Sequence, residues 1–197
     1  MARDTTQRRA ELRDRLIDIA EDEIRANGLA SLRARALADK AGCAVGAIYN
    51  VFDDLTGLVL AVNGRTFGRM GAEVSDAVRQ GPSDPVGTMV VMAKGYLRFA
   101  LRNPRLWRAL FDVQMTADSD VPRWYLEELQ RLFALIAAPL RILHPETPAD
   151  RIDLMTRALF SSVHGMVLLG TEHRISAVPE DRIDEMIEFL IPRVARP

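Results

Sequence analysis

The sequence predicts an all-α protein of about nine helices, and two observations indicate this fold class. Apolar residues recur at spacings of three and four along most of the chain, which is the period of an amphipathic helix. No stretch alternates strictly between apolar and polar residues over the length of a strand. With 197 residues and 48% hydrophobic content, the chain can bury a core. We expect a small head at residues 1–54 and a larger helical domain at residues 55–197.

Caps and prolines predict where the helices begin and end. An apolar row from Leu12 to Ile24 predicts a first helix of about twenty residues, which ends at the C-cap signal Asn27-Gly28. Four further starts are predicted by a polar residue followed by proline. They lie at Asp84-Pro85, Asn103-Pro104, Asp120-Val121-Pro122 and Thr147-Pro148. The last helix is expected to begin near Pro179, and the one before it to span about residues 149–174.

Composition limits the classes of function. The formal charge is −1, so any basic surface for nucleic acid has to be local. The single cysteine, Cys43, excludes an internal disulfide and agrees with a reducing compartment. No uninterrupted apolar run reaches the roughly 18 residues of a membrane span, and the N-terminus lacks a signal-peptide core. We expect a cytoplasmic protein with no membrane partner.

Catalytic and metal-binding motifs are absent from the sequence. The three histidines, His144, His164 and His173, show no His-x-x-x-His pair on one helical face, no glutamate at the spacing of a zinc protease and no cysteine partner for a metal site. There is no Gly-x-Ser-x-Gly elbow and no glycine-rich phosphate loop. We therefore expect no enzyme, no metal site and no cofactor.

Residues 31–53 have the spacing of a helix-turn-helix. Two short helices, 32–40 and 44–51, are expected to be joined by a turn at Ala41-Gly42-Cys43. Small residues at the start of the second helix allow its backbone to approach the base edges of a major groove. The residues expected to pack inward are Leu32, Leu37, Cys43, Ile48 and Phe52. Similar pairs of helices also occur in bundles that bind no nucleic acid, so the spacing alone leaves both interpretations open.

A longer pattern distinguishes these interpretations. A helix ending in Asn27-Gly28 is followed by Leu37-Ala38 and then by Ala41-Gly42-Cys43-Ala44-Val45-Gly46-Ala47-Ile48-Tyr49-Asn50-Val51-Phe52. In the identity and the order of these residues, positions 1–62 resemble the TetR family of bacterial transcriptional repressors. The resemblance implies a three-helix DNA-binding head, followed by a helical ligand-binding and dimerisation domain.

The resemblance also implies which residues contact DNA. Arg35 matches a base-contacting arginine of the family and Tyr49 a phosphate-contacting tyrosine, although each also suits an ordinary surface position. The expected DNA-contacting residues are Arg33, Arg35, Ala44, Val45, Gly46, Ala47, Tyr49 and Asn50. The chain departs from the family at Ala44, where a capping serine is usual, at Val51 in place of histidine, and at Leu55 in place of a phosphate-binding lysine. The N-terminal arginines, among them Arg3, Arg8, Arg9, Arg13 and Arg15, are expected to offset these losses.

The middle helices are rich in aromatic residues and methionine, which form either an ordinary core or the walls of an effector cavity. In a TetR-like protein the second interpretation predicts a small apolar or amphipathic effector. The residues expected to line the cavity are Phe67, Met70, Met92, Tyr96, Phe99, Trp107, Phe111, Trp124 and His164. His164 either binds an effector oxygen or is a buried histidine with a structural partner. The segments 99–107 and 161–165 resemble one subgroup of TetR ligand domains.

The last two helices are expected to pair with a second copy in a four-helix bundle. A homodimer suits a palindromic operator, because two recognition helices then enter successive major grooves of double-stranded DNA. We expect a ligand-responsive repressor in which the helix around residues 58–79 transmits the effector signal. The alternative is a helical small-molecule or protein-binding module whose degenerate helix-turn-helix binds DNA weakly.

Overall fold

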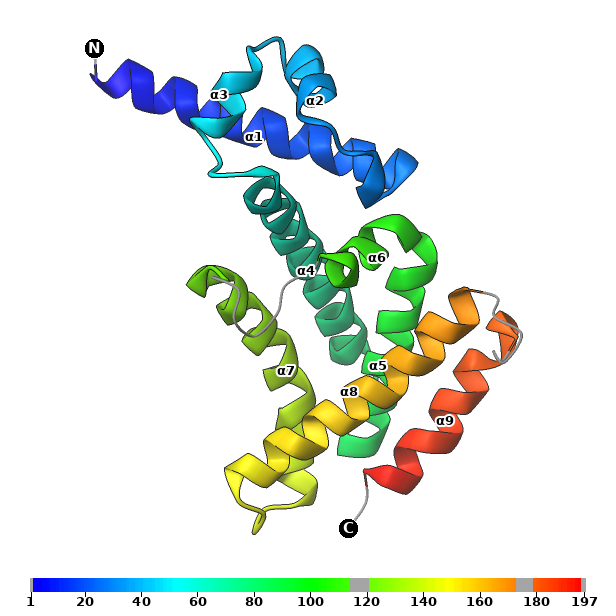
Figure 1. Cartoon of the computed structure of the whole chain (residues 1–197). Helices are drawn as coiled ribbons and strands as arrows, with labels where there is room; N and C mark the ends of the chain where they lie inside the picture. The colour runs from blue at the N-terminus through cyan, green and yellow to red at the C-terminus, as the bar shows by residue number, and fades with distance from the viewer. Residues whose placement is uncertain (1, 114–120, 173–178, 196–197) are drawn as a thin grey trace. The chain divides into compact units, whose positions relative to one another are not determined.

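The computed structural model describes residues 2–113, 121–172 and 179–195 (Figure 1). Within these residues the chain forms nine α-helices and two short 3-10 helices and contains no strand, which confirms the all-α prediction. The helices are α1 (Ala2–Asn27), α2 (Ala34–Ala41), α3 (Val45–Tyr49), α4 (Leu55–Gln80), α5 (Pro85–Arg102), α6 (Pro104–Asp112), α7 (Arg123–Leu143), α8 (Ala149–Thr171) and α9 (Ile183–Val194). The 3-10 helices are η1 (Leu29–Ser31) and η2 (Glu180–Arg182).

Proline and its preceding polar residue mark the helix starts as predicted for α5 and α6, which begin at Pro85 and Pro104. The Asp84 carboxylate accepts a hydrogen bond from the Gly87 amide at 2.8 Å, which caps α5. Helix α8 begins at Ala149, the start of the predicted span 149–174, and Pro148 is its N-cap rather than its first helical residue. Asp120 lies outside the described residues. Near Pro179 the chain first makes η2, so α9 begins at Ile183.

The chain forms two compact units, and the boundary between them falls inside α4. Unit 1 contains residues 1–68 and 103–125, and unit 2 contains residues 69–102 and 126–197. These units are defined by packing and divide the chain differently from the functional ranges 1–54 and 55–197. The functional division stays a prediction.

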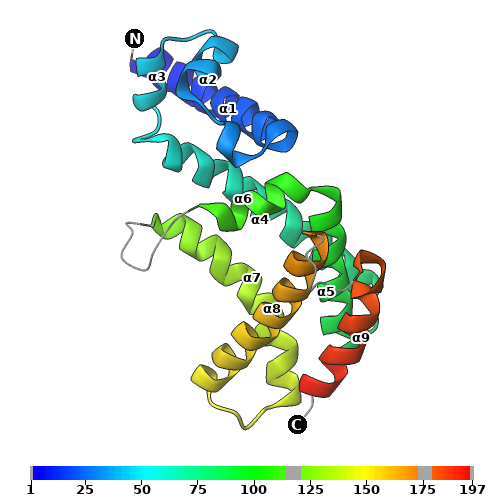
Figure 2. The same ribbon diagram turned by 45° about the vertical axis from the view of Figure 1, so that its right-hand side comes forward.

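In unit 1, α1 packs against η1, α2 and α6 (Figure 2). Its apolar face, with Leu16, Ala20 and Ile24, is fully buried. Leu37 of α2 and Ile48 of α3 belong to the same core. Burial of such side chains contributes about 1.5–3 kcal/mol each, so this core dominates the stability of the head.

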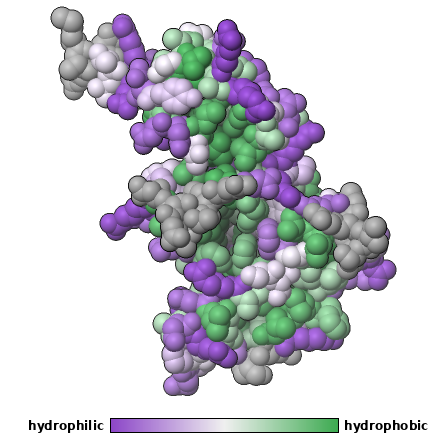
Figure 3. Space-filling view, in the orientation of Figure 1, coloured by the Kyte–Doolittle hydropathy of each residue, from purple (hydrophilic) through white to green (hydrophobic). Residues whose placement is uncertain are grey.

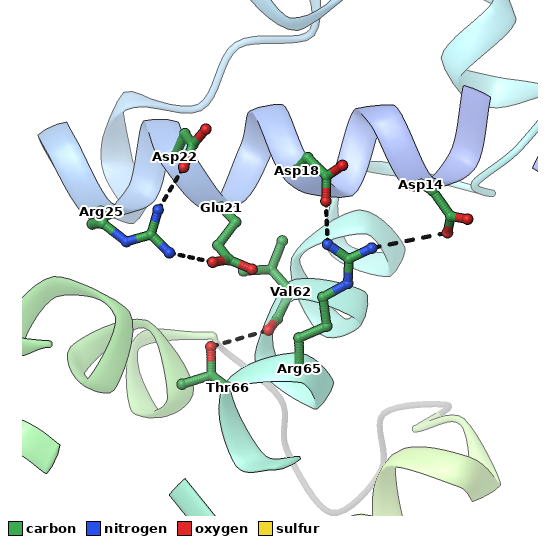
Figure 4. Close-up of polar contacts among 8 residues, drawn as sticks. All are labelled: Asp14, Asp18, Glu21, Asp22, Arg25, Val62, Arg65 and Thr66. Carbon is green, nitrogen blue, oxygen red and sulfur yellow. Dashed lines mark hydrogen bonds and ion pairs between the residues drawn. The ribbon is translucent and has the colours of Figure 1, made fainter. Parts of the chain in front are cut away.

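Ion pairs add to the attachment of α4 to α1 (Figure 4). The Arg65 guanidinium of α4 contacts the carboxylate of Asp18 and lies 3.9 Å from that of Asp14, both on α1. One turn along α4, the buried Thr66 hydroxyl donates to the Val62 carbonyl at 3.1 Å. Exposed pairs contribute at most about 1 kcal/mol each, so the Arg65 pairs orient α4 more than they stabilise it.

A pH-dependent contact joins α2 to α1. The Lys40 ammonium lies 2.5 Å from the Glu23 carboxylate, and this contact, helped by Asn27, lowers the pKa of Glu23 below 4.5. A lowered pKa in the folded state adds stability above the unfolded pKa, and that stability is lost as the pH falls through the folded pKa. We expect Glu23→Gln to lower the urea midpoint at pH 7 and to leave it unchanged at strongly acidic pH. An equal loss at both pH values would contradict this assignment.

In unit 2, α5, α8 and α9 pack against one another (Figure 1). The buried side chains include Phe99 of α5, Ile152 of α8 and Ile187 of α9. The Lys94 ammonium of α5 donates to the Glu188 carboxylate of α9 at 2.6 Å. These contacts position the two C-terminal helices beside each other.

The surface of α8 is unusually apolar. Among the described helices, α8 is the one long and apolar enough to cross a membrane by length and composition, yet only 28% of its most apolar stretch is buried. One such helix is weak evidence for a membrane span, because the core helix of a soluble protein passes the same test. Serine, threonine and arginine residues interrupt α8, so no apolar run in the sequence reaches the length of a membrane span.

Candidate nucleic-acid interface and aromatic clusters

The turn between α2 and α3 depends on Gly42. This residue has φ 65° and ψ 38°, the left-handed conformation that glycine adopts without steric cost. The Gly42 amide donates to the Asp39 carbonyl at 3.3 Å, and the Cys43 amide donates to the Ala38 carbonyl at 3.0 Å. These bonds complete the C-terminus of α2 and set the direction in which α3 begins.

Helix α3 has one buried side and one exposed side. Ile48 is 0% exposed and Phe52, just after the helix, is 6% exposed, so both anchor α3 in the head. On the other side Val45 is 39% exposed and Tyr49 is 48% exposed. A Cβ atom added at Gly46 meets no other atom within 4 Å. The first turn of α3 therefore presents backbone and small side chains to solvent.

The predicted interface is mostly exposed, with differences in detail. Helices α2 and α3 are shorter than expected, since α2 begins at Ala34 and α3 ends at Tyr49. Ala47 and Cys43 are both half-buried. Ala47 is therefore less exposed than predicted, and Cys43 is less buried than predicted. The exposed members of the predicted set are Arg33, Arg35, Ala44, Val45, Gly46, Tyr49 and Asn50. Ala44 is the N-cap residue of α3 and makes no side-chain cap bond, since alanine has no acceptor.

Three arginines of the head have structural partners that the sequence reading missed. Arg33 donates through Nη1 to the carbonyls of Ala30 and Leu32, each at 2.8 Å. The Arg15 Nη1 donates to the Ala41 carbonyl at 3.2 Å. The Arg13 guanidinium lies 5.2 Å from the centre of the Phe52 ring. A guanidinium has five N–H donors, so these contacts leave donors for phosphate oxygens while they hold the side chains in place.

Unit 1 contains an aromatic cluster beneath the head. The Tyr125 ring centre lies 5.4 Å from that of Phe67 and 5.6 Å from that of Trp124. Trp107 and Phe111 pack edge to face at 5.4 Å. The sequence predicted Phe67, Trp107, Phe111 and Trp124 as ligand-binding residues, and they belong to this unit. Tyr125 was missed.

Close packing in this cluster requires Gly64. A Cβ at this position of α4 would lie 2.9 Å from Trp124, which is closer than real Cβ contacts. The absence of a side chain therefore lets the indole ring lie against the α4 backbone.

Beside these rings lies Asn63, a polar residue of α4 that is 0% exposed. Its Nδ2 amide donates to the Ala109 carbonyl in the last turn of α6 at 3.0 Å. This carbonyl is one of the last four of its helix, which generally lack partners within the helix. Sequence reasoning missed Asn63, because an isolated asparagine in an amphipathic helix is usually a surface residue.

A second cluster lies in unit 2, which contains the other predicted ligand-binding residues Met70, Met92, Tyr96, Phe99 and His164. The Tyr96 hydroxyl and the His164 Nδ1 form a hydrogen bond of 2.8 Å. The Phe160 ring stacks on the His164 imidazole at 5.5 Å and 15°, and it packs edge to face on Phe133 at 5.3 Å. His164 thus has a structural partner, and its predicted contact with an effector stays a prediction.

A groove of about 290 Å³ lies between α7 and α8 in the same unit. It is lined by Gln130, Phe133, Ala134, Ala137, Arg141, Asp153, Thr156 and Arg157. None of the predicted ligand-binding residues lines this groove. Within the described ranges, no three histidine, cysteine, aspartate or glutamate side chains lie close enough to hold a metal ion.

Comparison with known proteins agrees with this geometry. A family model for the C-terminal domain of tetracycline-repressor-like proteins matches residues 89–194, more than half of the chain. No curated protein matches.

Solved structures with the same fold cover nearly the whole chain. A protein of unknown function from Rhodococcus sp. RHA1 has a TM-score of 0.75 at 21% identity and covers 93% of each chain. A TetR transcriptional regulator from the same organism has a TM-score of 0.64 at 18% identity, covering 94% of this chain and 96% of its own. RolR, solved in complex with resorcinol, has a TM-score of 0.69 at 22% identity, covering 98% and 97%. With its helix-turn-helix head and its matching C-terminal domain, this chain belongs to the TetR family of transcriptional regulators.

Proposed function

We propose that the protein is a ligand-responsive transcriptional repressor that acts in the cytoplasm. It binds a palindromic operator in double-stranded DNA as a homodimer, and a small apolar or amphipathic effector releases it. The observation that carries this proposal is the two-sided packing of α3. Ile48 is fully buried, whereas the first turn around Gly46 is open to solvent. A helix held in this way can enter a major groove without unfolding.

Binding to the intergenic DNA upstream of the protein's own gene tests this proposal. Fluorescence anisotropy across a salt series is expected to show tight, sequence-selective binding that weakens steeply with salt, because phosphate contacts release counterions. A shuffled duplex of equal length is the control. The alternative, a binding module with a degenerate head, predicts weak and equal binding to both duplexes. Ala44, which gives α3 no side-chain cap, and Leu55, which offers no phosphate contact, favour that alternative.

The homodimer is expected to form through α8 and α9. On α8, positions 154, 158, 161, 165 and 169 lie on one face, and Leu154 is 55% exposed. Phe189 of α9 is 60% exposed. Figure 3 shows hydrophobic side chains among polar ones on the surface of unit 2. A second copy would cover this apolar face, and Ala158 and Ser161 would allow close helix approach.

Ala158→Arg is expected to weaken the dimer roughly a hundredfold, because it places an unpaired charge in the helix contact. Sedimentation velocity across a concentration series measures the monomer–dimer equilibrium. Leu101→Asp, at an exposed position of α5, serves as the matched control and leaves the dimer intact. A dimer unaffected by Ala158→Arg would place the interface elsewhere.

Coupling between effector and DNA is expected to run through α4 and α6 inside unit 1. The Arg105 guanidinium of α6 donates to the last carbonyls of α1, those of Ala26 and, at 3.4 Å, Arg25. Arg65 joins α4 to the same helix. An effector that displaces either helix therefore acts on the head directly, and a differential affinity of a few kcal/mol suffices to empty the DNA-bound state. Unchanged operator affinity at saturating effector would contradict this coupling for that effector.

We expect the effector to be small and to contact aromatic side chains of the protein, given the ring clusters described above. The resorcinol bound to RolR is a ligand of this size in a protein of the same fold. Two of the solved structures with this fold are of TetR transcriptional regulators, and no enzymatic role is proposed for this chain.

A further inference from the structure

Asn63 combines complete burial with an oxygen atom that lacks a partner. The side chain is 0% exposed, and within the described residues its Oδ1 accepts no hydrogen bond. Buried carbonyl oxygens are rarely left in this state, and each such case calls for an explanation. The missing donor is either a water molecule or a group of a bound molecule.

The orientation of the amide is fixed by its other contact. The Ala109 carbonyl can only accept a hydrogen bond, so the Asn63 atom 3.0 Å away must be the donating nitrogen. Rotating the amide by 180° would place two acceptors against each other. The oxygen therefore stays directed away from α6 and remains available to a donor.

Tyr125 supplies a second polar group at the same place. Its side chain is 4% exposed, and the Asn63 side chain lies close enough to it to influence the pKa of its hydroxyl. Burial raises the pKa of the Tyr125 hydroxyl, and the nearby Asn63 side chain opposes this only in part. The hydroxyl is therefore protonated at neutral pH and can donate a hydrogen bond.

Two further aromatic rings pack on Tyr125. Phe67 lies one helical turn after Asn63 on α4, and its ring packs on that of Tyr125. Trp124, which is 41% exposed, packs edge to face on Tyr125 and lies against Gly64. A few convergent polar groups between apolar rings are the usual composition of a small-molecule site.

We propose that Asn63 and Tyr125 recognise the hydroxyl group of a neutral phenolic compound, whose ring packs among Phe67 and Trp124. The phenol hydroxyl donates to the Asn63 oxygen and accepts from the Tyr125 hydroxyl, so both partners are satisfied. A carboxylate is excluded, because it has no hydrogen to donate and would bury an uncompensated charge. This inference rests on the proposed function only where it takes such a compound to be the effector of the regulator.

Phenol and toluene test the inference, because they have nearly the same shape and differ in the hydroxyl group. Both tryptophans of the chain, Trp107 and Trp124, lie in unit 1, so their fluorescence reports on this site. With excitation at the red edge of the tryptophan band, the full-length protein is expected to bind phenol at least about tenfold more tightly than toluene. In Asn63→Leu this preference is expected to disappear. Thr66→Val, which removes a buried hydroxyl from the same helix, is the matched control and keeps the preference.

A second measurement covers the case in which Asn63→Leu fails to fold. In the unaltered protein, the side-chain amide resonances of Asn63 are expected to shift on addition of phenol and to stay in place with toluene. Equal affinity for both probes, no saturable binding of phenol, or a preference that survives in Asn63→Leu would overturn the inference and leave Asn63 as a cap of α6. These measurements involve no DNA. Failure to bind an operator would therefore refute the proposed function and leave the phenol result standing.

Discussion

Gly46→Leu is expected to reduce operator affinity about a thousandfold or more, to the level of non-specific DNA binding. The substitution is harmless to the free protein, because a side chain at this position meets no neighbouring atom within 4 Å. Glycine in a helix is also unfavourable by roughly 0.5–1 kcal/mol relative to alanine, so the melting temperature should hold or rise. On DNA, however, the added side chain separates the start of α3 from the base edges. Anisotropy titration and thermal unfolding measure the two effects.

Gly68→Leu provides the matched control for this experiment. Gly68 also lies in a helix with open space around it, but on α4 rather than on the recognition helix. It is expected to keep operator binding. If Gly46→Leu bound the operator as tightly as the unaltered protein, α3 would not enter the groove through its first turn.

Ile48→Ala is expected to lower the free energy of unfolding by about 2–5 kcal/mol, the usual cost of truncating a fully buried aliphatic side chain. Ile48 is 0% exposed and belongs to the core that joins α1, α2 and α3. Urea denaturation measures this loss. Because the head depends on a small core, Ile48→Ala should also reduce DNA binding indirectly.

A substitution at Tyr49, the residue after Ile48, distinguishes an effect on stability from an effect on DNA recognition. Tyr49 is 48% exposed, so Tyr49→Ala should change the unfolding free energy by less than about 0.5 kcal/mol. It should nevertheless weaken DNA binding, with a smaller dependence on salt, if its hydroxyl contacts a phosphate. Equal losses of stability in Ile48→Ala and Tyr49→Ala would mean that α3 docks on α1 through a different face.

Local signals in the sequence predicted the helices well. The Asp84-Pro85 pair starts α5 because the carboxylate caps the helix and proline already has a helical φ. Gly42 was expected in a turn, and its left-handed conformation is the reason that glycine occurs there. Such features depend on a few neighbouring residues and can be read without the fold.

Contacts between distant segments were not predictable in the same way. Asn63 is buried because α6, 46 residues further along the chain, covers it and accepts its hydrogen bond. The aromatic residues predicted as one cavity lining divide between two compact units, since composition does not reveal which helices pack together. Arg13 and Arg15 were grouped as a DNA-binding arm, yet each has a contact inside the head.

The two-sided packing of α3 bears on how such a regulator changes its target. Folding depends on Ile48 and Phe52, whereas Val45, Gly46 and Tyr49 protrude into solvent. Mutations at the protruding positions are therefore nearly free of folding cost, and new sequence preferences can accumulate there without loss of the scaffold. A library randomised at positions 45, 46 and 49 should consist mostly of folded proteins, from which repressors of altered specificity can be selected.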